Sequence, residues 1–373
     1  MKKDWILLCA VLMMAFGLTA CNVASAAGKG DDGKVKIVAT IFPEYDWVRN
    51  VLGENAQNAE LTLLLDNGVD LHSYQPTAAD ILKISSCDLF IYVGGESDEW
   101  VEDVLKQSTN KNQIVINLLE VLGDQVKEEE IVEGMEHEHD HEDGDHHHED
   151  GEDDHEDGDH DHEGGDEDHE DGDHDHEDAD DGHGHDHHHE DGEIEYDEHV
   201  WLSLKKAQVL CGAISDALEK LDTANAESYR KNCEAYQAKL ASLDAEYKEA
   251  VKAAKVNTLL FGDRFPFRYL VDDYDLKYYA AFVGCSAETE ASFETILFLA
   301  GKVDELKLPA ILTIEGVNHR IAETVKDNTK AKDQKILTMN SLQSVTGKDV
   351  EAGVTYFSVM EENLKVLKEA LGQ

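Results

Sequence analysis

Most histidines of this chain lie in one stretch, residues 136–191, which holds 17 of the 20 histidines and 30 of the 82 acidic residues. The stretch contains no lysine or arginine and no bulky apolar residue, so we expect a disordered, solvated loop that cannot offset the entropy of ordering. Imidazoles that alternate with carboxylates form a ligand set for divalent transition metals, above all zinc. We therefore predict low-affinity metal binding by a loop whose histidines include His137, His139, His141, His146, His147, His148, His187, His188 and His189.

Three histidines lie outside this loop, namely His72, His199 and His319. His72 is placed between the end of an expected strand and the start of an expected helix, and His199 stands where the chain enters its next helix. In open α/β sheets, ligands bind at the carboxyl ends of the strands. Two such histidines beside a metal-collecting loop predict an ordered metal site that contains His72 and His199.

The elements that must position these histidines alternate between strands and helices. Apolar runs predict strands at residues 35–40, 59–65, 88–93, 113–117, 258–261, 278–282, 310–314 and 335–338. Helical periodicity predicts helices at residues 43–52, 77–85, 99–107, 202–221, 226–254 and 355–371, with Thr77 and Asp80 as a capping pair. The fifth helix, about 40 Å long, matches the length of two lobes. We predict an α/β fold with two βα lobes, each with a parallel sheet, bridged by this helix, and a metal site in the cleft between them.

The N-terminus has the pattern of a secretory signal. Lys2 and Lys3 precede an apolar segment that is short for a membrane span, and the segment ends in Leu-Thr-Ala-Cys, similar to a lipoprotein cleavage motif. We therefore predict lipidation of Cys21 and an extracytoplasmic protein anchored to the cell membrane. The expected segments are a signal peptide (1–20), a tether (21–33), an N-terminal lobe with the loop (34–222), a linking helix (223–255) and a C-terminal lobe (256–373).

Cysteine spacing and net charge exclude further classes of site and partner. Four cysteines follow Cys21, none of them in a CxxC pair: Cys87, Cys211, Cys233 and Cys285. We expect their side chains to be buried and structural, with a disulfide between two of them as the alternative. The net charge of −50 disfavours nucleic acid and favours cations.

The chain resembles the cluster A-I solute-binding proteins of bacterial ABC transporters for zinc and manganese, and is most similar to the zinc-type members. The matching segments are TIFPEY at 40–45, HSYQPT at 72–77 with Asp80, DLFIYVGG at 88–95, Trp100-Val101, DEHVWLS at 197–203 and TIE at 313–315. Zinc members also carry an Asp/His-rich insertion just before the second histidine motif. The resemblance implies a monomeric receptor that delivers Zn²⁺, or alternatively Mn²⁺, to an ABC permease.

The C-terminal half departs from that family pattern. Most zinc members place a third histidine directly after the strand that follows the long helix, where this chain has Asp263 and Arg264. Since arginine does not bind cations, we expect Asp263 to be the third ligand, with Glu315 or water as the fourth. A carboxylate there narrows the preference for zinc over manganese. Further candidates for the open positions are His319, Glu288, Glu290 and Asn340.

Two other classes of function remain as alternatives. A hydrolytic zinc enzyme also uses two histidines and a carboxylate, but the chain lacks HExxH, GxSxG and a Gly-rich phosphate loop, so we expect no enzyme. A metal-storage or adhesive surface lipoprotein would use the loop and need no ordered site. For a receptor, zinc affinity is expected to fall as imidazoles become protonated below about pH 6.5.

Overall fold

The computed structural model describes residues 33–135, 195–286, 290–316 and 318–373. The expected signal peptide, Cys21, the histidine-rich loop and Glu288 lie outside these residues. Within the described residues, no helix is both long enough and apolar enough to cross a membrane.

The first lobe is built on a four-stranded parallel sheet. Its elements are β1 (Val35–Ala39), α2 (Phe42–Leu52), β2 (Ala59–Leu63), α3 (Ala78–Ser86), β3 (Leu89–Tyr92), α4 (Trp100–Lys106), β4 (Ile114–Asn117) and α5 (Leu118–Leu122). The strand order is β2-β1-β3-β4, and the two central strands are almost fully buried because their residues are nearly all apolar. The start of α3 is confirmed, since Thr77 and Asp80 form the expected capping box.

The second lobe repeats this topology. Its elements are β5 (Thr258–Phe265), α8 (Arg268–Asp273), β6 (Lys277–Val283), α9 (Phe293–Leu306), β7 (Ala310–Thr313), α10 (Arg320–Asn328) and β8 (Lys335–Thr338). The four parallel strands follow the order β6-β5-β7-β8, so in each lobe the second strand in sequence lies at the edge beside the first. The predicted α/β fold with two parallel sheets is confirmed.

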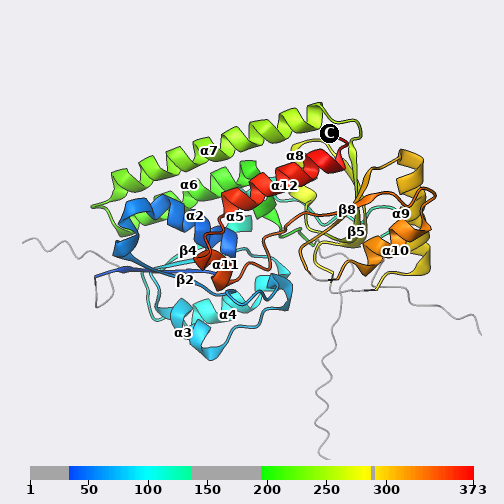
Figure 1. The fold of residues 1–373 in the computed structure, drawn as a ribbon. Coiled ribbons are helices and arrows are strands. Elements are labelled where there is room, and N and C mark those ends of the chain that lie inside the picture. The colour runs from blue at the N-terminus through cyan, green and yellow to red at the C-terminus, as the bar shows by residue number, and fades with distance from the viewer. Residues whose placement is uncertain (1–32, 136–194, 287–289, 317) are drawn as a thin grey trace, which may run out of the picture. The chain divides into compact units, whose positions relative to one another are not determined.

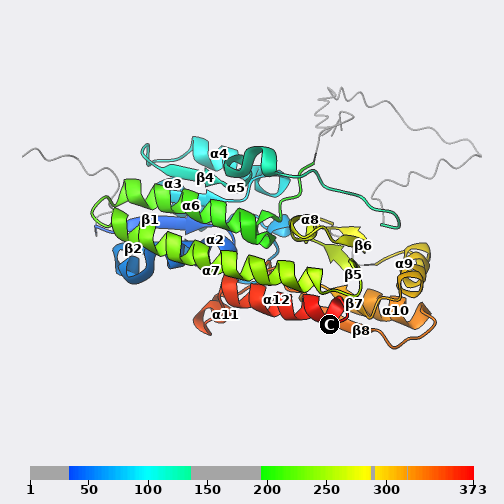
Figure 2. The same cartoon turned by 90° about the horizontal axis from the view of Figure 1, so that it is seen from above.

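Three helices run alongside one another and connect the lobes: α6 (Leu204–Leu221), α7 (Ala226–Lys252) and α12 (Tyr356–Ala370). Figure 2 shows α7 between α6 and α12, and in both views α7 reaches from the first sheet to the second (Figure 1 and Figure 2). At 27 residues, α7 is about 40 Å long, as the sequence predicts. The short helix α11 (Gly347–Glu351) precedes α12.

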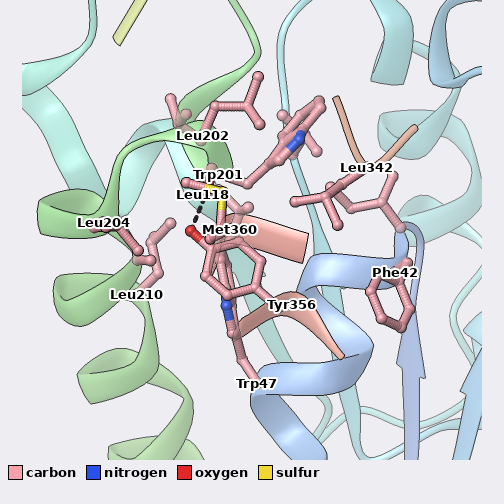
Figure 3. Close-up of a cluster of buried hydrophobic side chains, with 14 of the residues drawn as sticks. Phe42, Trp47, Leu118, Trp201, Leu202, Leu204, Leu210, Leu342, Tyr356 and Met360 are labelled. Atoms are coloured by element: carbon pink, nitrogen blue, oxygen red, sulfur yellow. Dashed lines mark hydrogen bonds between the residues drawn. The ribbon is translucent and has the colours of Figure 1, made fainter. Parts of the chain in front are cut away.

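The start of α12 lies against the first lobe, as Figure 3 shows for Tyr356. Its ring meets Trp47 of α2 edge-on, with centroids 5.3 Å apart, and its hydroxyl donates to the carbonyl of Trp201 at 2.7 Å. Its backbone N–H donates to the carboxylate of Asp46 at 3.0 Å. The segment predicted as a C-terminal lobe (256–373) therefore contributes the start of α12 to the core of the first lobe.

Two of the differences from the predicted element boundaries affect the candidate site. β5 continues to Phe265 instead of ending at Phe261, with a change of register between Phe261 and Arg264. Asp263 therefore lies within the irregular part of this strand and does not directly follow it, which corrects the expected position. The helix predicted from residue 202 begins at Leu204, because the Ser203 hydroxyl caps it by accepting from the N–H of Lys206 at 3.1 Å.

Candidate metal centre

Two short 3₁₀ turns position His72 and His199. His72 lies in the turn Leu71–Ser73, which follows β2, and its N–H donates to Oδ1 of Asp70 at 3.1 Å. His199 immediately precedes the turn Val200–Leu202, and its N–H donates to Oδ1 of Asp197 at 2.8 Å. An aspartate two residues before each histidine fixes the local backbone in both places.

The two imidazoles face each other, although 127 positions separate them in the sequence. Their Nε2 atoms are 3.2 Å apart. Nδ1 of His72 lies 2.7 Å from the Ser97 hydroxyl, and Nδ1 of His199 lies 3.1 Å from Oδ1 of Asp197. When each Nδ1–H donates to its oxygen, both Nε2 lone pairs point toward the same small volume. Two Zn–N bonds of ~2.0–2.1 Å at a tetrahedral angle require nitrogens about 3.3 Å apart, close to the observed separation.

The surroundings of His72 favour its neutral imidazole, which is the form that binds metals. His199 is fully buried, and the side chain of His72 is 11% exposed. Burial lowers the pKa of His72 to about 3, and neighbouring His199 and Arg264 act in the same direction, against the opposing effect of Asp70. For His72 we therefore expect protons to compete with a metal only well below pH 6.5.

Cys285 is the third group at this site, and the sequence reasoning missed it. Among the described residues, the cluster of His, Cys, Asp and Glu side chains that meets the spacing for a metal ion consists of His72, His199 and Cys285, with ligand atoms within 4.8 Å of one another. Cys285 follows β6, at the carboxyl edge of the second sheet. Cys87, Cys211 and Cys233 are buried free thiols, as expected, whereas Cys285 is partly exposed.

Acidic side chains surround the cluster. Burial of the Cys285 sulfur raises the pKa of its thiol well above the usual range, and Glu129, Glu198 and Asp197 raise it further. The Glu198 carboxylate is buried and accepts from the N–H of Ser97 at 2.9 Å, while its Oε2 lies 3.5 Å from Nδ1 of His72. Burial raises the pKa of Glu198 to about 7. When ionised, these carboxyl groups supply a negative environment for a cation.

Asp263 is engaged elsewhere. Its Oδ1 accepts from the N–H of Arg264 at 2.9 Å and its Oδ2 from the N–H of Ile314 at 3.2 Å. Within the described ranges, Asp263 is not part of the cluster around His72. The structure therefore does not bring Asp263 together with the two histidines.

Glu315 has a structural role in the second lobe. Its carboxylate accepts hydrogen bonds from the N–H of Ser341 at 2.6 Å, the Ser341 hydroxyl at 2.8 Å and the N–H of Gln343 at 3.2 Å. It thereby holds the loop after β8. In the described part of the chain, Glu315 also lies outside the cluster.

The remaining candidates have other positions. His319 is partly buried at the start of α10, and Glu290 is exposed. Asn340 uses its side-chain oxygen to accept from the N–H of Leu342 at 2.8 Å. Among the described residues, none of these three belongs to the cluster.

A cavity of about 360 Å³ opens beside the cluster. Its lining includes Asp70 and Ser73 from the first lobe and Asp263, Arg264 and Ser286 from the second. The guanidinium of Arg264 crosses this space: Nη2 lies 2.8 Å from Oδ2 of Asp70, and Nη1 donates to the Ser286 carbonyl at 3.3 Å. Residues of both lobes thus line a cavity next to the cluster.

Known proteins are similar in sequence to this chain over its whole length. The family model of the periplasmic component A of zinc-uptake complexes matches residues 37–370. The zinc-binding lipoprotein AdcA of Streptococcus pneumoniae R6 is 31% identical over 373 residues, which are 100% of this chain and 62% of AdcA. The high-affinity zinc uptake system protein ZnuA of Bacillus subtilis is 26% identical over 373 residues, 100% of this chain and 99% of ZnuA. The chain thus spans about three fifths of the AdcA relatives that it matches.

Solved structures share the fold. The Zn(II)-bound ZnuA-like domain of S. pneumoniae AdcA superposes with a TM-score of 0.62 at 28% identity, covering 91% of this chain and 100% of that domain. The periplasmic zinc-binding protein TroA of Treponema pallidum has a TM-score of 0.63 at 21% identity, covering 91% of this chain and 100% of TroA.

Proposed function

The chain belongs to the family of periplasmic A components of zinc-uptake complexes, and from this we propose that it is an extracytoplasmic receptor that captures Zn²⁺ and delivers it to an ABC permease. The family resemblance expected from the sequence is confirmed. In this proposal the ion is cargo that is bound and released unchanged, so no reaction is required of the site.

The facing imidazoles of His72 and His199 carry the proposal. Their Nε2 atoms, 3.2 Å apart, offer two nitrogen ligands, and Ser97 and Asp197 hold the opposite ring nitrogens. Imidazole suits zinc well, while manganese favours oxygen ligands. The arrangement therefore supports zinc over the manganese alternative.

Delivery requires that the protein stay near its permease. We propose that Cys21 is lipidated and anchors a monomeric receptor to the membrane; Cys21 itself lies outside the described residues. We also propose that the histidine-rich loop raises the local zinc concentration. The described residues on either side of the loop support this role. Glu128 and Tyr196 form an antiparallel bridge, and Tyr196 lies only three residues before His199, so the loop is attached close to the proposed site.

Zinc titration of the purified protein, in competition with a chelator of known affinity, tests the function. We expect one tight site in addition to weak sites, and a much weaker interaction with Mn²⁺. Uptake of labelled zinc by cells that lack this chain should fall and should recover when the chain is restored. A protein without a tight zinc site would instead fit the storage or adhesive alternative.

A further inference from the structure

We propose that Cys285 supplies a third zinc ligand through its sulfur, and that Arg264 is a positioning residue that holds the Cys285 turn against the His72 loop. The inference rests on the proposed function, because it names a ligand of the same site. It replaces the expectation that the third ligand is a carboxylate from Asp263.

Geometry places the sulfur beside the two imidazoles. The Sγ atom and the ligand nitrogens of His72 and His199 all lie within 4.8 Å of one another, and the two Nε2 atoms already have a separation suited to zinc. A zinc–sulfur bond of ~2.3 Å is slightly longer than a zinc–nitrogen bond, so one ion can bridge the three atoms after a small closure. Zinc accepts both thiolate sulfur and imidazole nitrogen in one site, as in the Cys₂His and Cys₂His₂ ligand sets.

Gly284, the residue before Cys285, allows the backbone to approach the imidazole of His199 closely. A β-carbon at Gly284 would lie 2.9 Å from Cε1 of His199 and 3.0 Å from the carbonyl oxygen of Phe265. The backbone of the turn therefore rests directly on the imidazole, which only glycine permits. Glycine at this position brings the next side chain to the metal centre.

Arg264 connects the loops that carry two of the ligands. One guanidinium nitrogen pairs with Asp70 at 2.8 Å, and Asp70 also accepts from the N–H of His72. Another donates to the carbonyl of Ser286, the residue after Cys285, at 3.3 Å. The planar fork of arginine reaches both partners at once, which the single ammonium of lysine cannot do in the same geometry.

The ligand set has a chemical consequence. Two neutral imidazoles and one thiolate leave a single positive charge on a zinc complex, and thiolate is a soft ligand that selects zinc over manganese. Zinc binding displaces the thiol proton, which passes to solvent, so the step is an exchange of H⁺ for Zn²⁺ at sulfur. Asp70 neutralises Arg264, so the arginine charge does not face the ion uncompensated.

Cobalt substitution in the full chain tests the sulfur ligand. Co²⁺ at substoichiometric loading should give a thiolate-to-cobalt charge-transfer band in the wild type and in Cys87→Ser, a matched change at a buried cysteine elsewhere. Cys285→Ser should lose the band and bind zinc at least about tenfold more weakly, while its circular dichroism stays native. X-ray absorption at the zinc edge should show one sulfur at ~2.3 Å.

The outcomes separate the ligand from the function. Tight zinc binding without sulfur in the wild type, and unchanged affinity in Cys285→Ser, would overturn the ligand assignment and leave the receptor function standing. Failure of the wild type to bind zinc tightly would overturn the function and this inference together. For Arg264, we expect Arg264→Lys to weaken zinc binding and to alter the cobalt band; an unchanged affinity and band in Arg264→Ala would refute the positioning role.

Discussion

Gly284 lies so close to the imidazole of His199 that a β-carbon there would fall 2.9 Å from Cε1 and 3.1 Å from Nδ1. The contact joins the second lobe to a ligand of the first, and Nδ1 is also the atom that Asp197 holds. A substitution at this glycine therefore acts on the orientation of the imidazole.

Gly284→Ala should weaken zinc binding by about tenfold or more, because His199 must tilt away from the shared ion. Gly301→Ala is the matched control: Gly301 lies in α9 with open space around it, and alanine there should leave affinity unchanged and stabilise the helix by ~1 kcal/mol. Chelator competition measures the affinities and thermal unfolding the stability. Equal zinc affinity of the two variants would contradict the role of the contact.

His72→Ala and His199→Ala should each weaken zinc binding by at least about tenfold, since each change removes one of two preorganised nitrogen donors. His319→Ala is the control, because His319 lies at the start of α10, away from the cluster. The titration is best read in protein that lacks residues 136–191, so that loop histidines do not mask the loss. Unchanged affinity in both single variants would eliminate the proposed site.

Deletion of residues 136–191 should remove several weak zinc sites and retain the tight one. The described residues on either side pair with each other, since the N–H of Asp197 donates to the carbonyl of Lys127 at 2.9 Å, so a short linker can join the ends. Isothermal titration calorimetry of both proteins measures the number of sites. Loss of the tight site on deletion would mean that the loop supplies a ligand.

Local patterns made the fold readable from the sequence. The capping pair Thr77 and Asp80 and the apolar strands depend on neighbours in the chain, and the structure reproduces them. The two histidines could be proposed because each lies outside the histidine-rich loop, on a segment that leads into a helix. Cys285 could not, because its ligand role depends on long-range packing of Gly284 against His199. The available signal was a Gly-Cys-Ser turn at the end of a predicted strand.

Asp263 was misassigned to the end of a strand because a register change inside β5 has no clear signature in the sequence. Gly262 was the available hint: a β-carbon there would lie 2.5 Å from Cα of Ala322, so the strand approaches α10 closely at that point.

Glu44 should make folding stability depend on pH. Burial raises its pKa from 4.5 to about 8, with Asp98 acting in the same direction. Between these two pH values Glu44 keeps its proton in the folded protein and releases it in the unfolded chain. The contribution of Glu44 to folding stability therefore falls as pH rises from about 4.5 to about 8 and is constant above about pH 8. In Glu44→Gln the decrease in the free energy of unfolding over this pH range should be smaller by roughly a few kcal/mol. Denaturant unfolding at several pH values checks it against Glu54→Gln, an exposed control. Parallel pH profiles for Glu44→Gln and the wild type would refute the assignment.

Asp263→Asn separates a ligand from a structural carboxylate. The two oxygens of Asp263 accept from the N–H groups of Arg264 and Ile314, so an amide retains one acceptor and presents a donor to the other N–H. Loss of one buried hydrogen bond should lower stability by ~1–2 kcal/mol. Zinc affinity should stay within about threefold of the wild type, because the zinc–ligand bonds are untouched when Cys285 provides the third donor. If Asp263 binds the ion instead, the same change removes an anionic ligand. Zinc affinity must then fall by tenfold or more, whatever the change in folding stability. Chelator competition and denaturant unfolding on the same variant therefore distinguish the carboxylate expected from the sequence from the sulfur inferred from the structure.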